Sequence, residues 1–459
     1  MFLDLDKKER SKIAVIDDSS RSVTYGDLCD FTEESSKYVP QRSLIFILSE
    51  NKIGSLLGYT ASLSNRIVPL IISAKTEEGL YTNLRDMYRP EYMWVPNELV
   101  AQLGYEVIFS AWDYSLVKTG FPKVPLFEEL SLLLPTSGST GSPKLVRHSY
   151  RNIEANADNV RRLFQLTEDE KAMAILPMHY TMGLSVIASH LLAGATLLLS
   201  GRSLLDKGFW AMLKEATSFT GVPYSYEILT KMRFTRMDLP NLKVITQGGG
   251  KLTEAMWNTL AQYAQDKGKQ FIATYGQSEC TARMAYLPAD LATTKVCSIG
   301  IAEPGGQLSL VDDNGNETFE GEAQGEMVYR GENVTLGYAT CREGLLNGDE
   351  NHGIMHTGDL ARRDADGCYY IIGRLKRFLK IFGLRIGLDE VENLIMSEFK
   401  IDCYCKGNDE KLIILVTDRS VINKLPAFIE EKTHLFHQKI EVQLVDAILR
   451  NEAGKVINQ

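Results

Sequence analysis

Short apolar runs alternate with longer amphipathic stretches through the N-terminal part of the chain. The apolar runs include residues 44–48, 172–176 and 270–273, and the amphipathic stretches include residues 150–166 and 252–267. Short apolar runs are typical of buried strands, whereas apolar positions repeated every three or four residues are typical of helices packed on a sheet. The alternation therefore predicts an α/β fold with layered, largely parallel sheets.

The pattern becomes more strand-like from Leu308 onward. Apolar segments there are short and are separated by turn residues such as those of 312–316, which predicts a smaller β-rich subdomain. The most apolar stretch of the chain, residues 184–200, contains a histidine, a glycine and a threonine and falls short of a membrane span. We interpret it as a buried helix followed by a strand, and we expect no stable membrane insertion.

A second change in pattern follows Gly373. A helix is expected from Asp389, where acidic residues occupy the first turn, and an apolar strand is expected over residues 411–416. We expect two domains, a large N-terminal one over residues 1–373 and a small α+β one over residues 374–459.

Composition indicates an ordinary globular protein that acts on small molecules. The 459 residues are 44% apolar and 24% charged, which excludes disordered and fibrous classes. The net charge is −9 and the basic residues are scattered, so a nucleic-acid partner has little electrostatic support.

The cysteines and the N-terminus indicate a cytoplasmic protein. Seven cysteines without dense spacing are typical of reduced thiols. Cys403 and Cys405 are too close together for a common zinc half-site, so we expect a strand with two ordinary thiols. The first residues lack the apolar core of a signal peptide.

One loop has the composition of a phosphate-binding site. An apolar run ending at Leu134 is followed by hydroxyl residues and glycines and then by a lysine: Thr136, Ser137, Gly138, Ser139, Thr140, Gly141 and Lys144. Glycines let backbone amides approach an anion, hydroxyls add donors and the lysine adds a charge. A flexible Ser/Gly linker is the alternative, although a linker would not normally follow a strand and end in a Pro-Lys pair. The spacing does not fit a Walker loop.

This loop resembles the signature loop of the adenylate-forming superfamily, which includes acyl-CoA and aryl-CoA synthetases, peptide-synthetase adenylation domains and luciferases. Other motifs of that superfamily follow in its order, at residues 273–279, 298–301, 325–334, 356–359, 373–374 and 454–455. The resemblance covers nearly the whole chain. It implies a large N-terminal domain with a small mobile C-terminal lid hinged near Lys376.

The resemblance also implies a reaction. ATP would activate a small carboxylic acid to an acyl-adenylate with release of pyrophosphate, and the acyl group would then pass to a thiol. Lys144 and its loop would hold phosphates, and Glu279 and Thr140 would hold Mg²⁺. Asp359 and Arg374 would bind the ribose, and Lys455 would reach the α-phosphate when the lid closes.

Further residues receive roles from the same resemblance. His179 would line the acyl site, Tyr275 would stack on adenine and Gly383 would lie beside the pantetheine arm of the thiol substrate. The remaining residues expected at the nucleotide are Gly248, Thr274, Gly276, Gln277 and Ser278.

The acid and the thiol acceptor are less well specified. No acidic residue lies beside His179 to grip an amino group, which favours an aliphatic, hydroxy or aryl acid over an amino acid. Arg283 and its neighbours are expected to line the acid pocket. We favour coenzyme A as acceptor, with the pantetheine of a carrier protein as the alternative. A non-catalytic binding protein of the same fold is a third interpretation.

Overall fold

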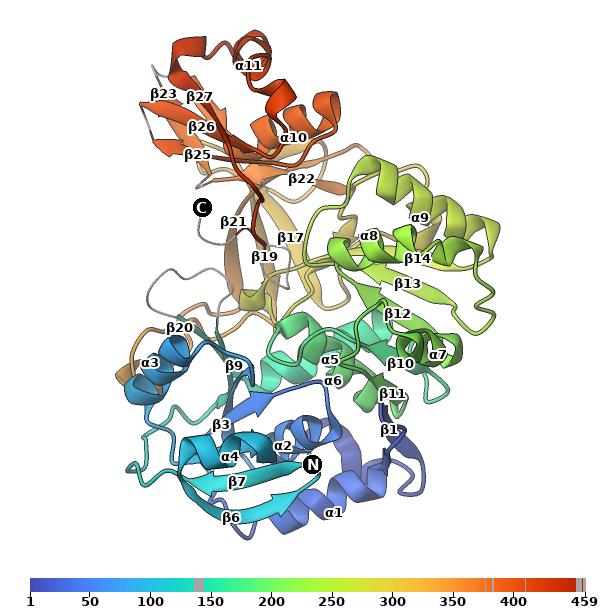
Figure 1. Ribbon diagram of the computed structural model, residues 1–459, viewed down its shortest axis with the longest axis vertical. Coiled ribbons are helices and arrows are strands. Elements are labelled where there is room, and N and C mark those ends of the chain that lie inside the picture. Colours follow the sequence, from blue (N-terminus) through green and yellow to red (C-terminus); the bar gives the residue numbers. More distant parts are fainter. Residues whose placement is uncertain (136–143, 376, 382–383, 409, 451–455, 457–459) are drawn as a thin grey trace. The chain divides into compact units, whose positions relative to one another are not determined.

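The computed structural model describes residues 1–135, 144–375, 377–381, 384–408, 410–450 and 456 (Figure 1). Contacts divide the chain into two compact units: one combines residues 1–307 with 330–355, and the other combines residues 308–329 with 356–459. The expected boundary after residue 373 stays a prediction.

The first sheet of the first unit is parallel through its centre. Its strand order is β16-β15-β14-β13-β12-β10-β11-β1-β2. Neighbours from β14 to β1 pair in parallel, and the strands outside them pair antiparallel. The strands are β1 (Ile13–Asp17), β2 (Ser22–Thr24), β10 (Lys171–Ala174), β11 (Thr196–Leu199), β12 (Ser218–Gly221), β13 (Val244–Gln247), β14 (Gln270–Tyr275), β15 (Ala285–Tyr286) and β16 (Ile301–Ala302).

The second sheet of this unit is mixed, with strand order β20-β9-β8-β4-β3-β5-β7-β6. Strands β3, β4, β5 and β8 pair in parallel, whereas β8 and β9 form an antiparallel pair. The strands are β3 (Leu44–Ser49), β4 (Val68–Ser73), β5 (Tyr92–Pro96), β6 (Glu106–Ala111), β7 (Tyr114–Lys118), β8 (Leu130–Pro135), β9 (Leu145–Ser149) and β20 (Tyr338–Ala339).

Helices connect and cover these strands (Figure 1). They are α1 (Tyr25–Ser35), α2 (Ile53–Ser64), α3 (Glu78–Tyr88), α4 (Asn97–Leu103), α5 (Tyr150–Leu163), α6 (Thr181–Ala193), α7 (Lys207–Glu215), α8 (Pro223–Lys231) and α9 (Glu254–Asp266). Helices α5 and α6 pack against each other. Ser149 caps α5, because its hydroxyl accepts from the Asn152 amide at 3.1 Å while the Asn152 side chain accepts from the Ser149 amide at 2.8 Å.

Two glycines one turn apart bring α2 close to its sheet. A Cβ on Gly58 would lie 2.3 Å from Cδ1 of Trp94, and one on Gly54 would lie 2.4 Å from Cδ2 of Tyr114. The indole nitrogen of Trp94 donates to the Gly54 carbonyl at 2.7 Å. The buried aromatic side chains of β5 and β7 therefore occupy the space that larger helix residues would need.

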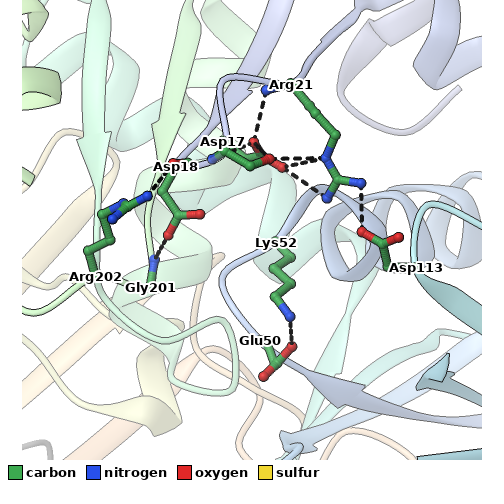
Figure 2. A network of polar contacts seen from close by, with 9 residues as sticks. Asp17, Asp18, Arg21, Glu50, Lys52, Asp113, Gly201 and Arg202 are labelled. Carbon is green, nitrogen blue, oxygen red and sulfur yellow. Dashed lines mark hydrogen bonds and ion pairs between the residues drawn. The ribbon is translucent and has the colours of Figure 1, made fainter. Parts of the chain in front are cut away.

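A polar network holds the turn between β1 and β2 (Figure 2). The Arg21 guanidinium contacts the carboxylates of Asp17 and Asp113 at 3.2 and 2.6 Å. The carbonyl of Asp18 accepts from Nη2 of Arg202 at 2.8 Å. Because Arg202 follows β11 and Asp113 precedes β7, the network ties the N-terminal hairpin to residues from both sheets.

The second unit combines an antiparallel sheet with a small α+β module. The sheet has the order β18-β17-β19-β21-β22, and the module contains a β23-β24 pair and a β25-β26-β27 sheet. The elements are β17 (Gly306–Val311), β18 (Glu317–Thr318), β19 (Ala323–Gly331), β21 (Ile354–Arg363), β22 (Tyr369–Arg374), β23 (Phe378–Ile381), β24 (Leu384–Gly387), α10 (Leu388–Phe399), β25 (Cys403–Asn408), β26 (Lys411–Val416), α11 (Leu425–Thr433) and β27 (Ile440–Leu444).

The module has its own buried core, and a cation fixes its first strand. Apolar side chains of α10, α11 and the module's strands form one buried cluster. Nη2 of Arg377 donates to Oε1 of Glu392 on α10 at 2.7 Å and to the carbonyl of Cys405 on β25 at 2.9 Å. Arg377 thus joins the start of the module to its helix and to its sheet.

These observations confirm the α/β fold with a β-rich part and a small C-terminal module. The apolar stretch 184–200 is the end of α6 followed by β11, and residues 411–416 form β26 as expected. Cys403 and Cys405 are buried thiols on one strand, and the seven cysteines are free. Over the described residues, each helix is either too short or too polar to cross a bilayer.

Gly58→Ala is expected to destabilise the protein by about 1–3 kcal/mol, because the added methyl group overlaps the Trp94 ring. The readout is a lower midpoint of thermal unfolding. Gly79→Ala on α3 is the matched control, since no atom of the described residues lies within 4 Å of its Cβ position. An equal fall of the midpoint in both variants would contradict the packing argument.

Candidate functional site

The candidate phosphate loop joins the two strands of a hairpin. Strand β8 ends at Pro135, and β9 begins at Leu145, which pairs with Pro135 in antiparallel register. The loop residues 136–143 lie outside the described residues, and Lys144 is described and exposed. The apolar strand expected before the loop is confirmed.

Lys144 and Glu279, which are far apart in the sequence, meet at one tyrosine. The hydroxyl of Tyr338 donates to Oε1 of Glu279 at 2.6 Å. Nζ of Lys144 lies 5.6 Å from the centre of the Tyr338 ring, within the range of a cation–π contact. A cation, a carboxylate and a phenol therefore gather at the end of the candidate phosphate loop.

Residues 333–338, which we call the strap, hold the backbone around Glu279. The amide and the hydroxyl of Thr335 both donate to the Glu279 carbonyl at 3.0 Å. The side-chain nitrogen of Asn333 donates to the carbonyls of Cys280 and Arg283 at 3.0 and 2.9 Å. Asn333 and Thr335 are fully buried, so these bonds are shielded from water.

A buried arginine anchors the strap to β9. Arg147 is 0% exposed. Its Nε donates to the Tyr338 carbonyl at 3.1 Å, and its Nη2 donates to the Leu336 carbonyl at 2.8 Å and contacts Oε2 of Glu350 at 2.9 Å. Gly337, which lies between Leu336 and Tyr338, has φ +109°, and a Cβ there would lie 2.4 Å from Oε2 of Glu350. The position thus requires glycine.

Several other expected residues gather where strands β13 and β14 end. A Cβ on Gly248 would lie 2.6 Å from Cε of Met182 and 2.8 Å from Oγ1 of Thr274. The hydroxyl oxygens of Ser278 and Thr181 lie 3.4 Å apart. The carboxyl ends of parallel strands form ligand sites in open α/β sheets. The structure brings the start of α6 to that edge.

The turn after β14 is tightly folded. A Cβ on Gly276 would lie 1.6 Å from the carbonyl oxygen of Ala282. Any residue larger than glycine would therefore clash with the backbone at this position. The side-chain nitrogen of Gln277 donates to the hydroxyl of Tyr275 at 3.1 Å. The expected nucleotide residues Tyr275, Gly276 and Gln277 therefore form one compact turn before Glu279.

His179 lies on the loop between β10 and α6. Asn51, which the sequence did not suggest as a site residue, holds this loop. The side-chain oxygen of Asn51 accepts from the Met178 amide at 3.3 Å. Its nitrogen donates at 3.0–3.2 Å to the carbonyls of Ile175, Leu176 and Ser200. His179 is half-buried against Tyr180, with ring centres 4.4 Å apart. Burial lowers the pKa of His179 to about 4, so the ring is neutral at pH 7.

Arg283 takes part in the packing of the interior. It is 1% exposed, its Nη1 donates to the hydroxyl of Ser185 on α6 at 2.9 Å, and its guanidinium lies 5.3 Å from the Phe164 ring centre. Burial lowers the pKa of Arg283 to about 10. The contacts assign this cation to the junction with α6 and provide no support for a contact with the acid.

The expected ribose pair lies in the second unit. Asp359 on β21 and Arg374 on β22 are directly opposite in antiparallel register, with Nε of Arg374 3.1 Å from Oδ1 of Asp359. The Asp359 side chain is almost fully buried and the Arg374 side chain is half exposed. The pair thus presents a fixed carboxylate beside a more accessible cation.

The remaining expected site residues lie outside the described residues. They are Thr136, Ser137, Gly138, Ser139, Thr140, Gly141, Gly383 and Lys455. Their roles stay predictions, as do the roles of the described residues toward a nucleotide.

Glu279 suits a metal ion that takes most of its ligands from water and phosphate and few from the protein. The described residues contain no cluster of three or more His, Cys, Asp or Glu side chains placed to hold a metal. Mg²⁺ commonly binds through one or two carboxylates together with phosphate oxygens and water. Glu279 therefore fits Mg²⁺ that arrives with a triphosphate.

Sequence reasoning missed four residues that organise the site: Asn51, Arg147, Asn333 and Tyr338. Asn333 and Tyr338 lie within or just beyond the resembling segment 325–334, which was the only signal for them. For Asn51 and Arg147 the sequence offers no local pattern, because their partners lie more than a hundred residues away.

Comparison with known proteins gives a consistent result. A sequence model described as AMP-binding enzyme matches residues 92–339. The oxalate–CoA ligase of Arabidopsis thaliana is 26% identical over 372 residues, covering 77% of this chain and 71% of the relative. A feruloyl-CoA synthase of Amycolatopsis sp is 28% identical over 352 residues, covering 73% and 70%.

The fold has solved counterparts as well. The o-succinylbenzoate coenzyme A synthetase of Bacillus subtilis, in complex with ATP and magnesium ion, superimposes with a TM-score of 0.79 at 19% identity. The match covers 99% of this chain and 97% of that one. At this identity the likeness shows the shared fold.

The His179 ring is expected to titrate near pH 4. The unfolded ring has a pKa of about 6.5, so its contribution to stability is complete above that pH and is lost as the pH falls toward 4. Histidine NMR signals followed from pH 7.5 to about 3, with His179→Gln to assign the resonance, measure the midpoint. A midpoint near 6.5 would contradict the burial argument.

Proposed function

The chain belongs to the AMP-binding enzyme family, and from this membership we propose that it is an acid–thiol ligase. It activates a carboxylic acid with ATP to an acyl-adenylate, releases pyrophosphate, and transfers the acyl group to coenzyme A. The observation that carries the proposal is the meeting of Lys144, Tyr338 and Glu279 at the end of the β8–β9 loop.

The first half-reaction gives the acid a leaving group. A carboxylate oxygen attacks the α-phosphorus of ATP, the bond from that phosphorus to the bridging oxygen breaks, and pyrophosphate departs with the electron pair. Charge builds up on the departing phosphates, and fixed cations lower the barrier by meeting that charge. Lys144 and the loop 136–143 supply this positive environment, and the lysine belongs to the cluster described above.

Glu279, together with Thr140, would hold the Mg²⁺ that accompanies ATP. When bound, the ion neutralises phosphate charge. Glu279 is suited to this task because its backbone is fixed by Thr335 and its carboxylate tip by Tyr338.

Other residues orient the nucleotide and complete the reaction. Tyr275 packs on adenine, Asp359 accepts from the ribose hydroxyls, and Arg374 donates to the ribose or a phosphate. Lys455 is the cation proposed to meet the α-phosphate and the carboxylate. In the second half-reaction the coenzyme A thiol attacks the acyl carbon, AMP leaves, and a thioester forms.

The acid class follows from the surroundings of His179. A neutral imidazole beside Tyr180 offers no negative charge for an α-ammonium group, which supports an aliphatic, hydroxy or aryl acid. The names of both curated relatives specify coenzyme A, which supports it as the acceptor. Thioester formation that requires a carrier protein in place of coenzyme A would favour the carrier-loading alternative.

Carboxylate-dependent exchange of labelled pyrophosphate into ATP, with Mg²⁺ and a panel of short, long, aryl and amino acids, tests the first half-reaction. We expect exchange with one class of acid. The exchange rate of Lys144→Met should be about 100-fold lower, because its cation no longer stabilises the phosphate charge. Lys171→Met, at an exposed strand terminus, is the matched control. Exchange that does not depend on any acid, or equal rates in both variants, would contradict the assignment.

Lys455→Ala is expected to separate the two half-reactions. The adenylation rate should fall about 100-fold or more, because the cation that stabilises charge at the α-phosphate is lost. Transfer from a synthetic acyl-adenylate to coenzyme A should stay within a few-fold of the unmodified rate. Adenylation at the unmodified rate would exclude Lys455 as the catalytic cation.

A further inference from the structure

Tyr338 joins two residues to which the proposed function gives separate tasks. Its hydroxyl donates to Glu279, the expected magnesium ligand, at 2.6 Å. Its ring faces Lys144, the expected phosphate ligand, with Nζ 5.6 Å from the ring centre. A single side chain thus contacts both groups.

The backbone of Tyr338 is fixed independently of these contacts. Tyr338 pairs with Val146 in the β20–β9 register, and its carbonyl accepts from the buried Arg147. The preceding Gly337 is held in a conformation that only glycine adopts readily. The ring therefore projects from a rigid base, so its hydroxyl and its face have defined positions.

The phenol is a donor that keeps its proton. A tyrosine hydroxyl ordinarily has a pKa of about 10, so it carries its proton and can donate at neutral pH. A carboxylate has two oxygens and about four acceptor positions, so a donor on Oε1 uses only part of its capacity. The bond to Tyr338 can therefore persist while the same carboxylate binds a cation.

Glu279 is consequently held at both ends. Thr335 fixes its carbonyl through two bonds, and Tyr338 fixes its carboxylate. A ligand whose rotamer is already selected loses less conformational entropy when the ion binds. Partners of this kind commonly change metal affinity by about 10–100-fold when they are removed.

We propose that Tyr338 is a positioning residue that orients the Glu279 carboxylate toward the Mg²⁺ of bound Mg·ATP and holds the Lys144 ammonium against its ring. The inference rests on the proposed function, since it assumes that Glu279 meets the metal. The hydroxyl acts on the metal and the ring acts on the lysine, so the two parts of the side chain can be tested separately.

The experiment measures ATP binding by calorimetry to the full chain, without acid or thiol, in EDTA and in saturating Mg²⁺. Tyr338→Phe removes the hydroxyl and keeps the ring. We expect its metal-free affinity for ATP to stay within about three-fold, and the gain in affinity caused by Mg²⁺ to fall about ten-fold. Tyr338→Leu removes the ring as well and should also weaken metal-free binding.

Two controls separate positioning from general damage. Tyr81→Phe, on α3, removes a phenol whose partner is the sulfur of Met93 and should leave both affinities unchanged. In a Glu279→Gln background, Tyr338→Phe should have no further effect on the Mg²⁺ gain, because the carboxylate it orients is absent. Tyr338 is 37% exposed, so loss of its hydroxyl is expected to leave the thermal midpoint nearly unchanged.

The outcomes distinguish this inference from the proposed function. An unaltered Mg²⁺ gain in Tyr338→Phe, or effects that add in the double variant, would overturn the positioning role. Mg²⁺-dependent ATP binding that Tyr338→Phe reduces, in a protein that activates no acid, would refute the ligase and retain the positioning role. If Mg²⁺ causes no gain in ATP affinity in the unmodified protein, both are overturned.

Discussion

The candidate site depends on one buried cation. Arg147 on β9 is fully buried, and its guanidinium binds backbone carbonyls of the strap and the carboxylate of Glu350. A buried charge is tolerated only when its donors are paired, and loss of a partner in such a set commonly costs about 3–5 kcal/mol. This arrangement fixes the strap relative to β9, the strand that begins directly after Lys144.

Close backbone approach is the second constraint. The turn that leads from β14 to Glu279 passes so near the Ala282 backbone that only glycine fits at residue 276. Gly248 lies close to the side chains of Met182 and Thr274. Small residues at the strand ends let α6, the turn and the strap converge there. The reactive side chains are therefore carried on rigid elements, as electrostatic catalysis requires.

Features that depend on nearby residues could be predicted from the sequence. Strand β26, helix α9 and the buried α6–β11 segment follow from local hydrophobic spacing, and the glycine-rich and acidic motifs indicated a nucleotide site. Contacts across large sequence separations could not be predicted. Tyr338 and Glu279 are 59 residues apart, and Asn51 and Ile175 are 124 apart, so no local pattern marks either pair. Arg283, which is expected to line the acid pocket, contacts Ser185, which is 98 residues away, and no local pattern indicates that pair either.

The proposed ligase cleaves ATP between its α- and β-phosphates to activate an acid for thioester formation. Phosphorus NMR of the complete reaction, with Mg·ATP, an accepted acid and coenzyme A, identifies the cleaved bond directly. We expect AMP and pyrophosphate in equal amounts, matched by the thioester formed. Formation of ADP and inorganic phosphate would contradict the proposed function, because cleavage at the γ-phosphate does not produce an acyl-adenylate.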